Sequence, residues 1–179
     1  MRIILMGVIV LCGVRFGLAQ NETKTTTSFT ISGEIKNPVT VQIADLGKWT
    51  SQNIGDIVIT NHLGEKKSKA NALKGVLLKD VLGTVEINAE SPKVLSEYYF
   101  VCRAYDGYTV VYSWNELFNT ATGNAAFIVT GKDGMSVAQM PDAILMISSA
   151  DFKTGRRYIK GLAAIDVKRA DIQQKGSRQ

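Results

Sequence analysis

The stretch YYFVCRAYDGYTVVYSWNEL (residues 98–117) decides the fold, because it encodes two strands, a tight turn and the start of a helix in one short run. Two apolar runs flank Asp106 and Gly107. An Asp-Gly pair between apolar runs predicts a β-hairpin, since glycine accepts the positive φ that such turns need. Ser113 is followed three residues later by Glu116, which is the spacing of a capping box and predicts a short helix over SWNELF.

Cys102 lies in the first strand of this hairpin. Side chains alternate between the two faces of a strand, so Phe100, Cys102 and Ala104 share one apolar face and Arg103 takes the other. A buried thiol behaves as a small hydrophobe and has a raised pKa. We therefore predict a core position for Cys102. The alternative, a reactive site, would need Arg103 or His62 close enough to hold a thiolate, and Arg103 points the other way on an ideal strand.

Outward from the hairpin, strands alternate with short helices. The stretch LKGVLLKDVLG (73–83) predicts the clearest helix, with Val76, Leu77 and Val81 at helical spacing and Gly83 at its end. A glycine inside a strand often marks a bend, which we expect at Gly161. Strands are expected at 28–35, 56–69, 97–105, 108–113, 124–137, 141–151 and 156–169, some of them running into turns, and helices at 41–49, 73–83 and 113–118. This order predicts an α+β fold, with a mixed or antiparallel β-sheet system and short inserted helices.

The two ends of the chain differ from the domain between them. Residues 1–19 have the layout of a secretory signal peptide with cleavage after Ala19, so we expect a periplasmic or secreted protein. The apolar run 3–14 is too short for a membrane span. Leu11 stands before Cys12 where a lipid-anchor signal has a small residue. The expected organisation is a signal peptide at 1–19, a disordered segment at 20–27, one domain at 28–170 and a basic tail at 171–179.

Composition and charge exclude some functions. The chain is 45% hydrophobic and 21% charged, as in ordinary globular proteins. Its net charge of +5 falls to +3 once Arg2 and Arg15 leave with the signal peptide. Much of the remaining positive excess lies in a loop at 64–69 and in the tail, whereas a nucleic-acid-binding surface gathers basic residues on one element with aromatic residues between them. We therefore expect no nucleic-acid partner.

Few motifs in the chain carry chemistry. His62 is the only histidine, and the sequence holds no HExxH, CxxC or phosphate-binding loop. The stretch ISSAD (147–151) lacks the flanking glycines of a nucleophile elbow. Four cations follow it within DFKTGRRYIKG (151–161), namely Lys153, Arg156, Arg157 and Lys160. They could hold a phosphate or sulfur oxyanion, or form a solvated hairpin, and the residues leave both interpretations open.

Four motifs taken in order suggest a family. They are ISGEIKNPVTVQIADL, LKGVLLKDVLG, CRAYDGYTVVYSWNEL and MPDAILMISSADFKTGRRYIKGLAAIDV. Together they resemble the oxidoreductase molybdopterin-binding domain of the sulfite oxidase family, in a small exported single-domain form, over residues 29–168. The resemblance implies molybdopterin as the cofactor, although no cofactor is evident from the motifs alone. With the cations above, it gives a candidate cofactor-binding set of His62, Arg103, Lys153, Arg156, Arg157 and Lys160.

The sequence departs from this family at the residue that matters most. In active members one cysteine thiolate, upstream of the LKGVLLKDVLG-like segment, binds the metal. No cysteine lies between Cys12 and Cys102 here, and His62 stands in that neighbourhood instead. Loss of a soft thiolate should abolish or alter the metal chemistry. Two functions therefore stay open: a redox enzyme with an altered metal site that binds a pterin cofactor, or a cofactor-free exported module that binds a small anionic ligand or another partner.

Overall fold

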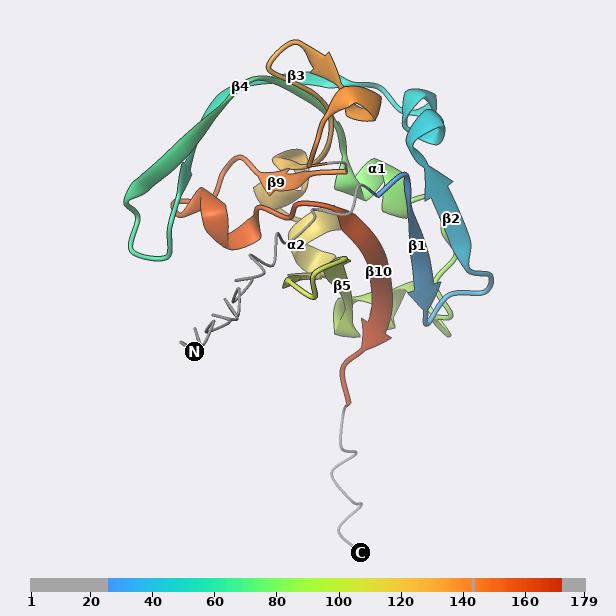
Figure 1. Ribbon diagram of the computed structural model, residues 1–179. Helices are drawn as coiled ribbons and strands as arrows, with labels where there is room; N and C mark the ends of the chain where they lie inside the picture. The colour runs from blue at the N-terminus through green and yellow to red at the C-terminus, as the bar shows by residue number, and fades with distance from the viewer. Residues whose placement is uncertain (1–25, 143, 172–179) are drawn as a thin grey trace, which may run out of the picture.

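The computed structural model describes residues 26–142 and 144–171. The expected signal peptide, nearly all of the expected disordered segment and the tail from residue 172 lie outside the described residues. The described chain forms an α+β fold of two β-sheets joined by short helices, as the sequence predicts (Figure 1). None of the described helices is long and apolar enough to cross a membrane.

The first sheet contains the predicted hairpin. Its strands are β1 (Ser28–Gly33), β2 (Val39–Gln42), β5 (Tyr98–Ala104), β6 (Thr109–Ser113) and β10 (Leu162–Arg169). They are ordered β2-β1-β10-β5-β6, and only the β1–β10 pair is parallel. The Asp-Gly turn closes the β5–β6 hairpin, with Gly107 at a φ of 88° and Cys102 opposite Val110. The hairpin prediction is thus confirmed.

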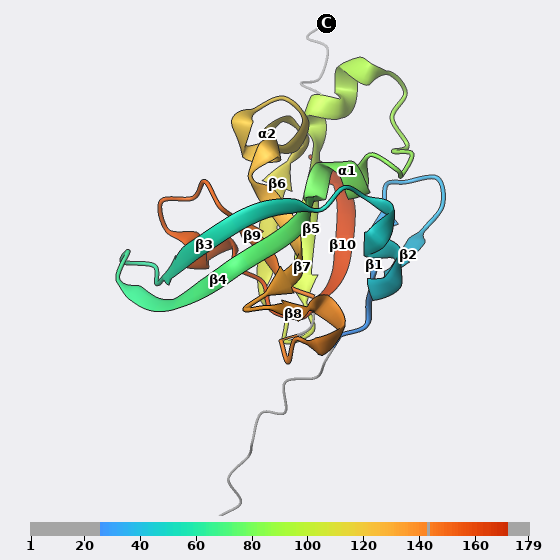
Figure 2. The ribbon, with the colours of Figure 1, turned by 90° about the horizontal axis from the view of Figure 1, so that it is seen from above.

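The second sheet is built around one long hairpin. Its strands are β3 (Gln52–Thr60), β4 (Lys66–Leu77), β7 (Ala126–Lys132) and β8 (Met135–Ser136), with β9 (Met146–Ser148) paired to β7. Figure 2 shows β3 and β4 extending together away from the rest of the domain. The turn between β3 and β4 therefore lies at an outer corner of the molecule.

Short helices connect the strands. They are α1 (Leu78–Leu82), α2 (Trp114–Phe118) and the 3-10 helices η1 (Ile43–Lys48), η2 (Pro92–Glu97), η3 (Ala121–Asn124), η4 (Val137–Gln139) and η5 (Thr154–Arg157). Helix α2 begins as predicted: the Ser113 hydroxyl accepts from the Glu116 N–H at 3.1 Å, and the Glu116 carboxylate accepts from the Ser113 N–H at 2.8 Å. This reciprocal pair satisfies two backbone donors at the helix start.

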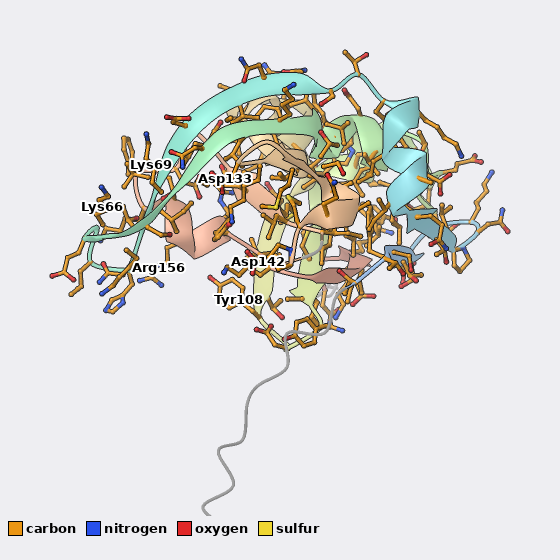
Figure 3. The ribbon with its side chains drawn as sticks, turned by 45° about the horizontal axis from the view of Figure 1, so that its top comes forward. Lys66, Lys69, Tyr108, Asp133, Asp142 and Arg156 are labelled. Atoms are coloured by element: carbon orange, nitrogen blue, oxygen red, sulfur yellow. The ribbon has the colours of Figure 1, made fainter. Side chains whose placement is uncertain are left out.

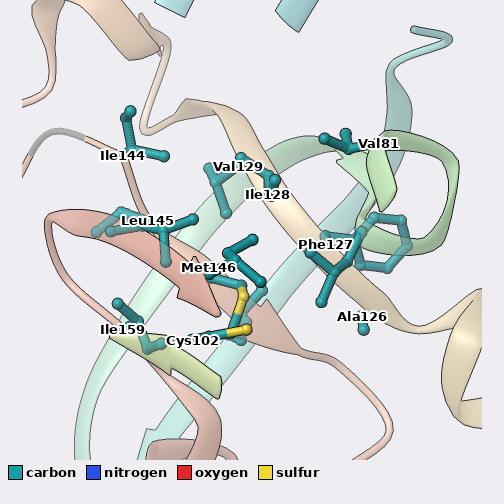
Figure 4. Close-up of a cluster of buried hydrophobic side chains, with 14 of the residues drawn as sticks. Val81, Cys102, Ala126, Phe127, Ile128, Val129, Ile144, Leu145, Met146 and Ile159 are labelled. Carbon is teal, nitrogen blue, oxygen red and sulfur yellow. The ribbon is translucent and has the colours of Figure 1, made fainter. Parts of the chain in front are cut away.

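The apolar faces of the two sheets form one core (Figure 4). Residues from the first sheet, such as Phe100 and Ile165, join the same buried cluster as Val76 and Ile128 from the second. Cys102 lies within this cluster. A core of this size supplies the stability that the described chain needs without a disulfide.

The predicted helix over residues 73–83 is wrong in its first half. The residues up to Leu77 belong to β4, and only Leu78–Leu82 is helical. Val76 and Leu77 pair with Ile128 and Phe127 of β7, and a side chain at Gly75 would meet the Ile128 carbonyl oxygen at 2.8 Å. An apolar run that is buried on both faces fits a central strand as well as a helix, and pairing with β7 decides for the strand.

The predicted last strand also begins later than expected. Residues 154–157 form η5, and β10 starts only at Leu162. Gly161 takes a φ of 68° just before β10, and the register against β5 is irregular between Leu162 and Ala164, so the predicted bend falls at the start of the strand. The expected strand over 141–151 is likewise reduced to β9.

Candidate functional site

Cys102 faces the core, as the strand alternation predicts. Its side chain has no exposed surface, and burial raises the pKa of the thiol to about 12. Arg103, the next residue, is exposed and pairs through Nη2 with Asp166 Oδ2 at 3.0 Å. A thiol in this setting is protonated at neutral pH and inaccessible, so it is a poor nucleophile and a poor metal ligand.

Arg157 is the centre of a polar network between β6, α2 and η5. Its Nε and Nη2 atoms donate to the two carboxylate oxygens of Asp151 at 2.7 and 2.6 Å. Its Nη1 donates to Glu116 Oε1 at 3.2 Å, and the guanidinium lies 4.5 Å from the centre of the Tyr112 ring. The hydrogen bonds to Asp151 contribute most to raising the pKa of Arg157 above its already high ordinary value, and Glu116 and Tyr112 add to this effect. Because two parallel hydrogen bonds join its guanidinium to Asp151, Arg157 has a structural role.

The Tyr112 hydroxyl is buried beside this network. It has no hydrogen-bond partner among the described residues. Ser148 lies near it, but the Ser148 hydroxyl donates to Asp151 Oδ1 at 2.7 Å. Burial raises the pKa of Tyr112 well above its ordinary value, so the phenol stays neutral.

Helix η5 is fixed against the end of β3. The buried Thr154 hydroxyl donates to the Val58 carbonyl at 2.6 Å and accepts from the Thr60 N–H at 3.1 Å. A Cβ on Gly155 would overlap the Thr60 carbonyl oxygen, so only glycine permits this approach. On the other side the Tyr108 hydroxyl, from the Asp-Gly turn, donates to the Arg156 carbonyl at 2.8 Å. Three segments far apart in the sequence therefore meet at η5.

A basic pocket opens beside η5. Its volume is ≈ 480 Å³, and its lining consists of Thr122, Ala150, Asp151, Phe152, Lys153, Arg156 and Arg157. Lys153 and Arg156 are exposed and form no ion pair within the described residues, whereas Arg157 is held by Asp151 and Glu116. We call this hollow the basic pocket. Its two uncompensated cations are the groups available to an anionic ligand.

The structure gathers part of the candidate set. Lys153, Arg156 and Arg157 line the basic pocket together. His62 lies exposed in the β3–β4 turn, whose Gly64 adjoins Lys153. The other two candidates stand apart from the pocket lining: Lys160 pairs with Asp142 at 3.2 Å, and Arg103 pairs with Asp166.

A second hollow, of ≈ 420 Å³, lies between α1, α2 and η2. Its lining is mainly apolar and includes Trp114 and Phe118, which stack with ring centres 5.2 Å apart. The two carboxylates at its rim are already used, Glu86 by Lys36 and Glu90 by Arg169. This hollow offers no uncompensated charge, so the basic pocket is the better candidate site.

Sequence reasoning missed several residues of the site. Asp151, Glu116 and Tyr112 fix Arg157, and Thr154 fixes η5, yet none stood out as a site residue in the sequence. The capping box at Ser113 was the one local signal near them, because it placed the Glu116 carboxylate at the start of α2. The remaining partners meet through the fold and have no local signature.

The residues present do not fit a metal–thiolate centre. Among the described residues, no three His, Cys, Asp or Glu side chains gather where they could hold one metal ion. The described cysteine is buried and protonated, and among the described residues His62 belongs to no group of three or more possible metal ligands. The soft donor that a molybdenum site requires is therefore not offered to the basic pocket.

Comparisons with known proteins support the fold. No protein-family model and no curated protein matches the chain. The class that the geometry defines, an α+β domain of two sheets with short inserted helices, also occurs in a solved structure. This is the sulfane dehydrogenase SoxCD from Paracoccus pantotrophus, which is similar with a TM-score of 0.52 and 9% sequence identity. The match covers 83% of this chain but 39% of that chain, so this protein spans about two fifths of its length. Likeness at this identity shows a distant fold relationship.

Proposed function

We propose that this protein is an exported binding module on a sulfite oxidase-like fold, which holds a small anion in the basic pocket and has lost the metal–thiolate chemistry of that family. The observation that carries the proposal is the separation of thiol from pocket. Cys102 lies in the core with no exposed surface, while Lys153 and Arg156 line an open hollow and have no carboxylate partner among residues 26–142 and 144–171.

The chemistry of the pocket supports a phosphate or sulfur oxyanion as its ligand. Arg156 presents a planar fork that matches such oxygens, and Lys153 adds a compact charge. Arg157 contributes through position, because its bonds to Asp151 and Glu116 hold the pocket wall in place. The tie from Thr154 to β3 fixes the loop that carries Lys153, so little ordering is needed on binding.

A second candidate function follows from the fold likeness to SoxCD, namely a redox enzyme that carries a molybdopterin cofactor. The phosphate of a pterin is an anion of the kind that the basic pocket would take. A metal centre with the family's cysteine ligation would however need Cys102 to leave the core, where its pKa is about 12. We therefore place this function second.

Isothermal titration of the protein with inorganic phosphate and with sulfate tests the proposal. The double variant Lys153→Gln/Arg156→Gln should lose at least tenfold in affinity, since each charge-assisted bond is worth about 1.5–3 kcal/mol. Lys93→Gln is the matched control, because Lys93 is also exposed and forms no ion pair with any residue that the structure describes, but lies on η2, away from the pocket lining. Equal affinity in the double variant and the control would refute the proposal.

A further inference from the structure

Two large apolar side chains stand exposed at one corner of the molecule. Phe152 is 102% exposed and Leu63 is 64% exposed. They belong to adjoining loops, because the Lys153 Cε atom lies 4.0 Å from the point where a Cβ on Gly64 would stand. Single exposed apolar side chains are common on protein surfaces, but two on neighbouring protruding loops mark a contact surface more strongly.

Both apolar side chains are presented by ordered backbone. The Asn61 side chain accepts from the N–H groups of Leu63 and Glu65 at 2.9 and 3.0 Å, which closes the turn with Leu63 at its apex. Phe152 stands between Asp151, which Arg157 holds, and Thr154, which is tied to β3. Since the backbone on either side is fixed, inserting these side chains into a partner costs little conformational entropy.

Cations surround the two apolar side chains. Lys66, Lys67, Lys153 and Arg156 are all exposed and form no ion pair within the described residues. Figure 3 shows Lys66 and Arg156 toward the same end of the molecule. Many other basic side chains of the fold are compensated, among them Lys36, Lys132 and Arg169. The exposed Glu65 carboxylate, which accepts from Asn61 Nδ2 at 2.8 Å, lies in the same turn, so the four cations leave this corner with an excess of positive charge that faces solvent.

We propose that this basic corner, defined by Leu63, Lys66, Lys67, Phe152, Lys153 and Arg156, docks onto the surface of an anionic phospholipid bilayer. Projecting apolar side chains insert into the boundary between headgroups and acyl chains without needing a complementary pocket, and the surrounding cations match anionic headgroups. A protein partner would instead have to supply a cavity for a fully exposed phenylalanine. The inference rests on the proposed function only because the basic corner and the basic pocket have Lys153 and Arg156 in common.

Vesicle co-sedimentation tests this inference, with the protein in the form recovered from cells. The two probes are phosphatidylcholine vesicles and phosphatidylcholine vesicles that contain about 30% phosphatidylglycerol. We expect binding to the anionic vesicles that weakens as salt rises, and little binding to the neutral ones. Phe152→Ser should lower the partition coefficient at least tenfold, because it removes the burial of a phenylalanine. Lys66→Gln should lower it about fivefold, because it removes one cation near a charged surface.

Several results would overturn the inference. Equal binding of Phe152→Ser and wild type, equal binding to both kinds of vesicle, or an unchanged partition coefficient for Lys66→Gln would each do so. Saturable binding to an acidic protein, without vesicle binding, would also refute it in favour of a protein partner. Lys93→Gln is the control for charge alone. Lys66 lies outside the lining of the basic pocket, so phosphate titration of the wild type and of Lys66→Gln separates the two proposals: phosphate binding without vesicle binding refutes only the bilayer inference.

Discussion

Replacement of Cys102 by serine separates a core thiol from a functional one. The thiol is completely buried, and its strand pairs Cys102 with Val110 on one side and Ile165 on the other. Serine is nearly the same size but brings a hydroxyl into this apolar setting, which costs about 1–3 kcal/mol when no partner is assured. Cys102→Ala is the matched control, since it removes the sulfur without adding a polar group and should cost about 1 kcal/mol.

Urea unfolding followed by the fluorescence of Trp49 and Trp114 gives the free energies of unfolding. We expect Cys102→Ser to be the least stable of the three proteins and its affinity for phosphate to match the wild type. The native thiol should also react with a disulfide reagent only after denaturation, because a thiol with a pKa of about 12 has almost no thiolate at neutral pH. A stable Cys102→Ser variant that had lost ligand or metal binding, or fast labelling of the folded protein, would refute the core assignment.

Three further predictions concern stability. Ser113→Ala removes the cap of α2 and should lower the free energy of unfolding in urea by about 1 kcal/mol. Ser113→Thr should keep most of that stability. An alanine variant as stable as the wild type would contradict the role of the cap. Gly155→Ala should cost about 1–3 kcal/mol, because the new Cβ meets the Thr60 carbonyl, and Gly47→Ala, where the space is open, is its control in thermal unfolding. The folded state raises the pKa of Cys102 from 9.0 to about 12, so unfolded chains lose their thiol proton first and stability falls as pH rises from 9 toward 12. At pH 10 this loss should be on the order of 1 kcal/mol. It should be absent from Cys102→Ala, and an equal pH dependence in both proteins would rule it out.

The features that the sequence predicted well are those set by local chemistry. The Asp-Gly turn, the alternation around Cys102 and the Ser113 cap depend on neighbours a few residues away, and the structure confirms all three. The helix predicted from residue 73 failed because Gly75 and Val76 are drawn into pairing with β7, a contact that the local pattern does not encode. The spacing of these apolar residues fits a helix and a buried strand equally well.

The candidate site also combines features that the sequence predicted with contacts that only the structure shows. The sequence placed four cations between residues 153 and 160 but could not say which were free. Arg157 is used by Asp151, Glu116 and Tyr112, and Lys160 by Asp142, whereas Lys153 and Arg156 stay available. These partners come from β6, α2 and separate loops, so only the tertiary structure reveals which charges are compensated.

The cofactor content of protein purified from its own host, with cofactor synthesis intact, tests the central claim most directly. The measurement is the molybdenum content by mass spectrometry, together with pterin fluorescence after denaturation. We predict neither in amounts approaching the protein concentration, because the described thiol is held in the core with a pKa of about 12. Equimolar molybdenum and pterin, both lost in Cys102→Ser, would contradict the account.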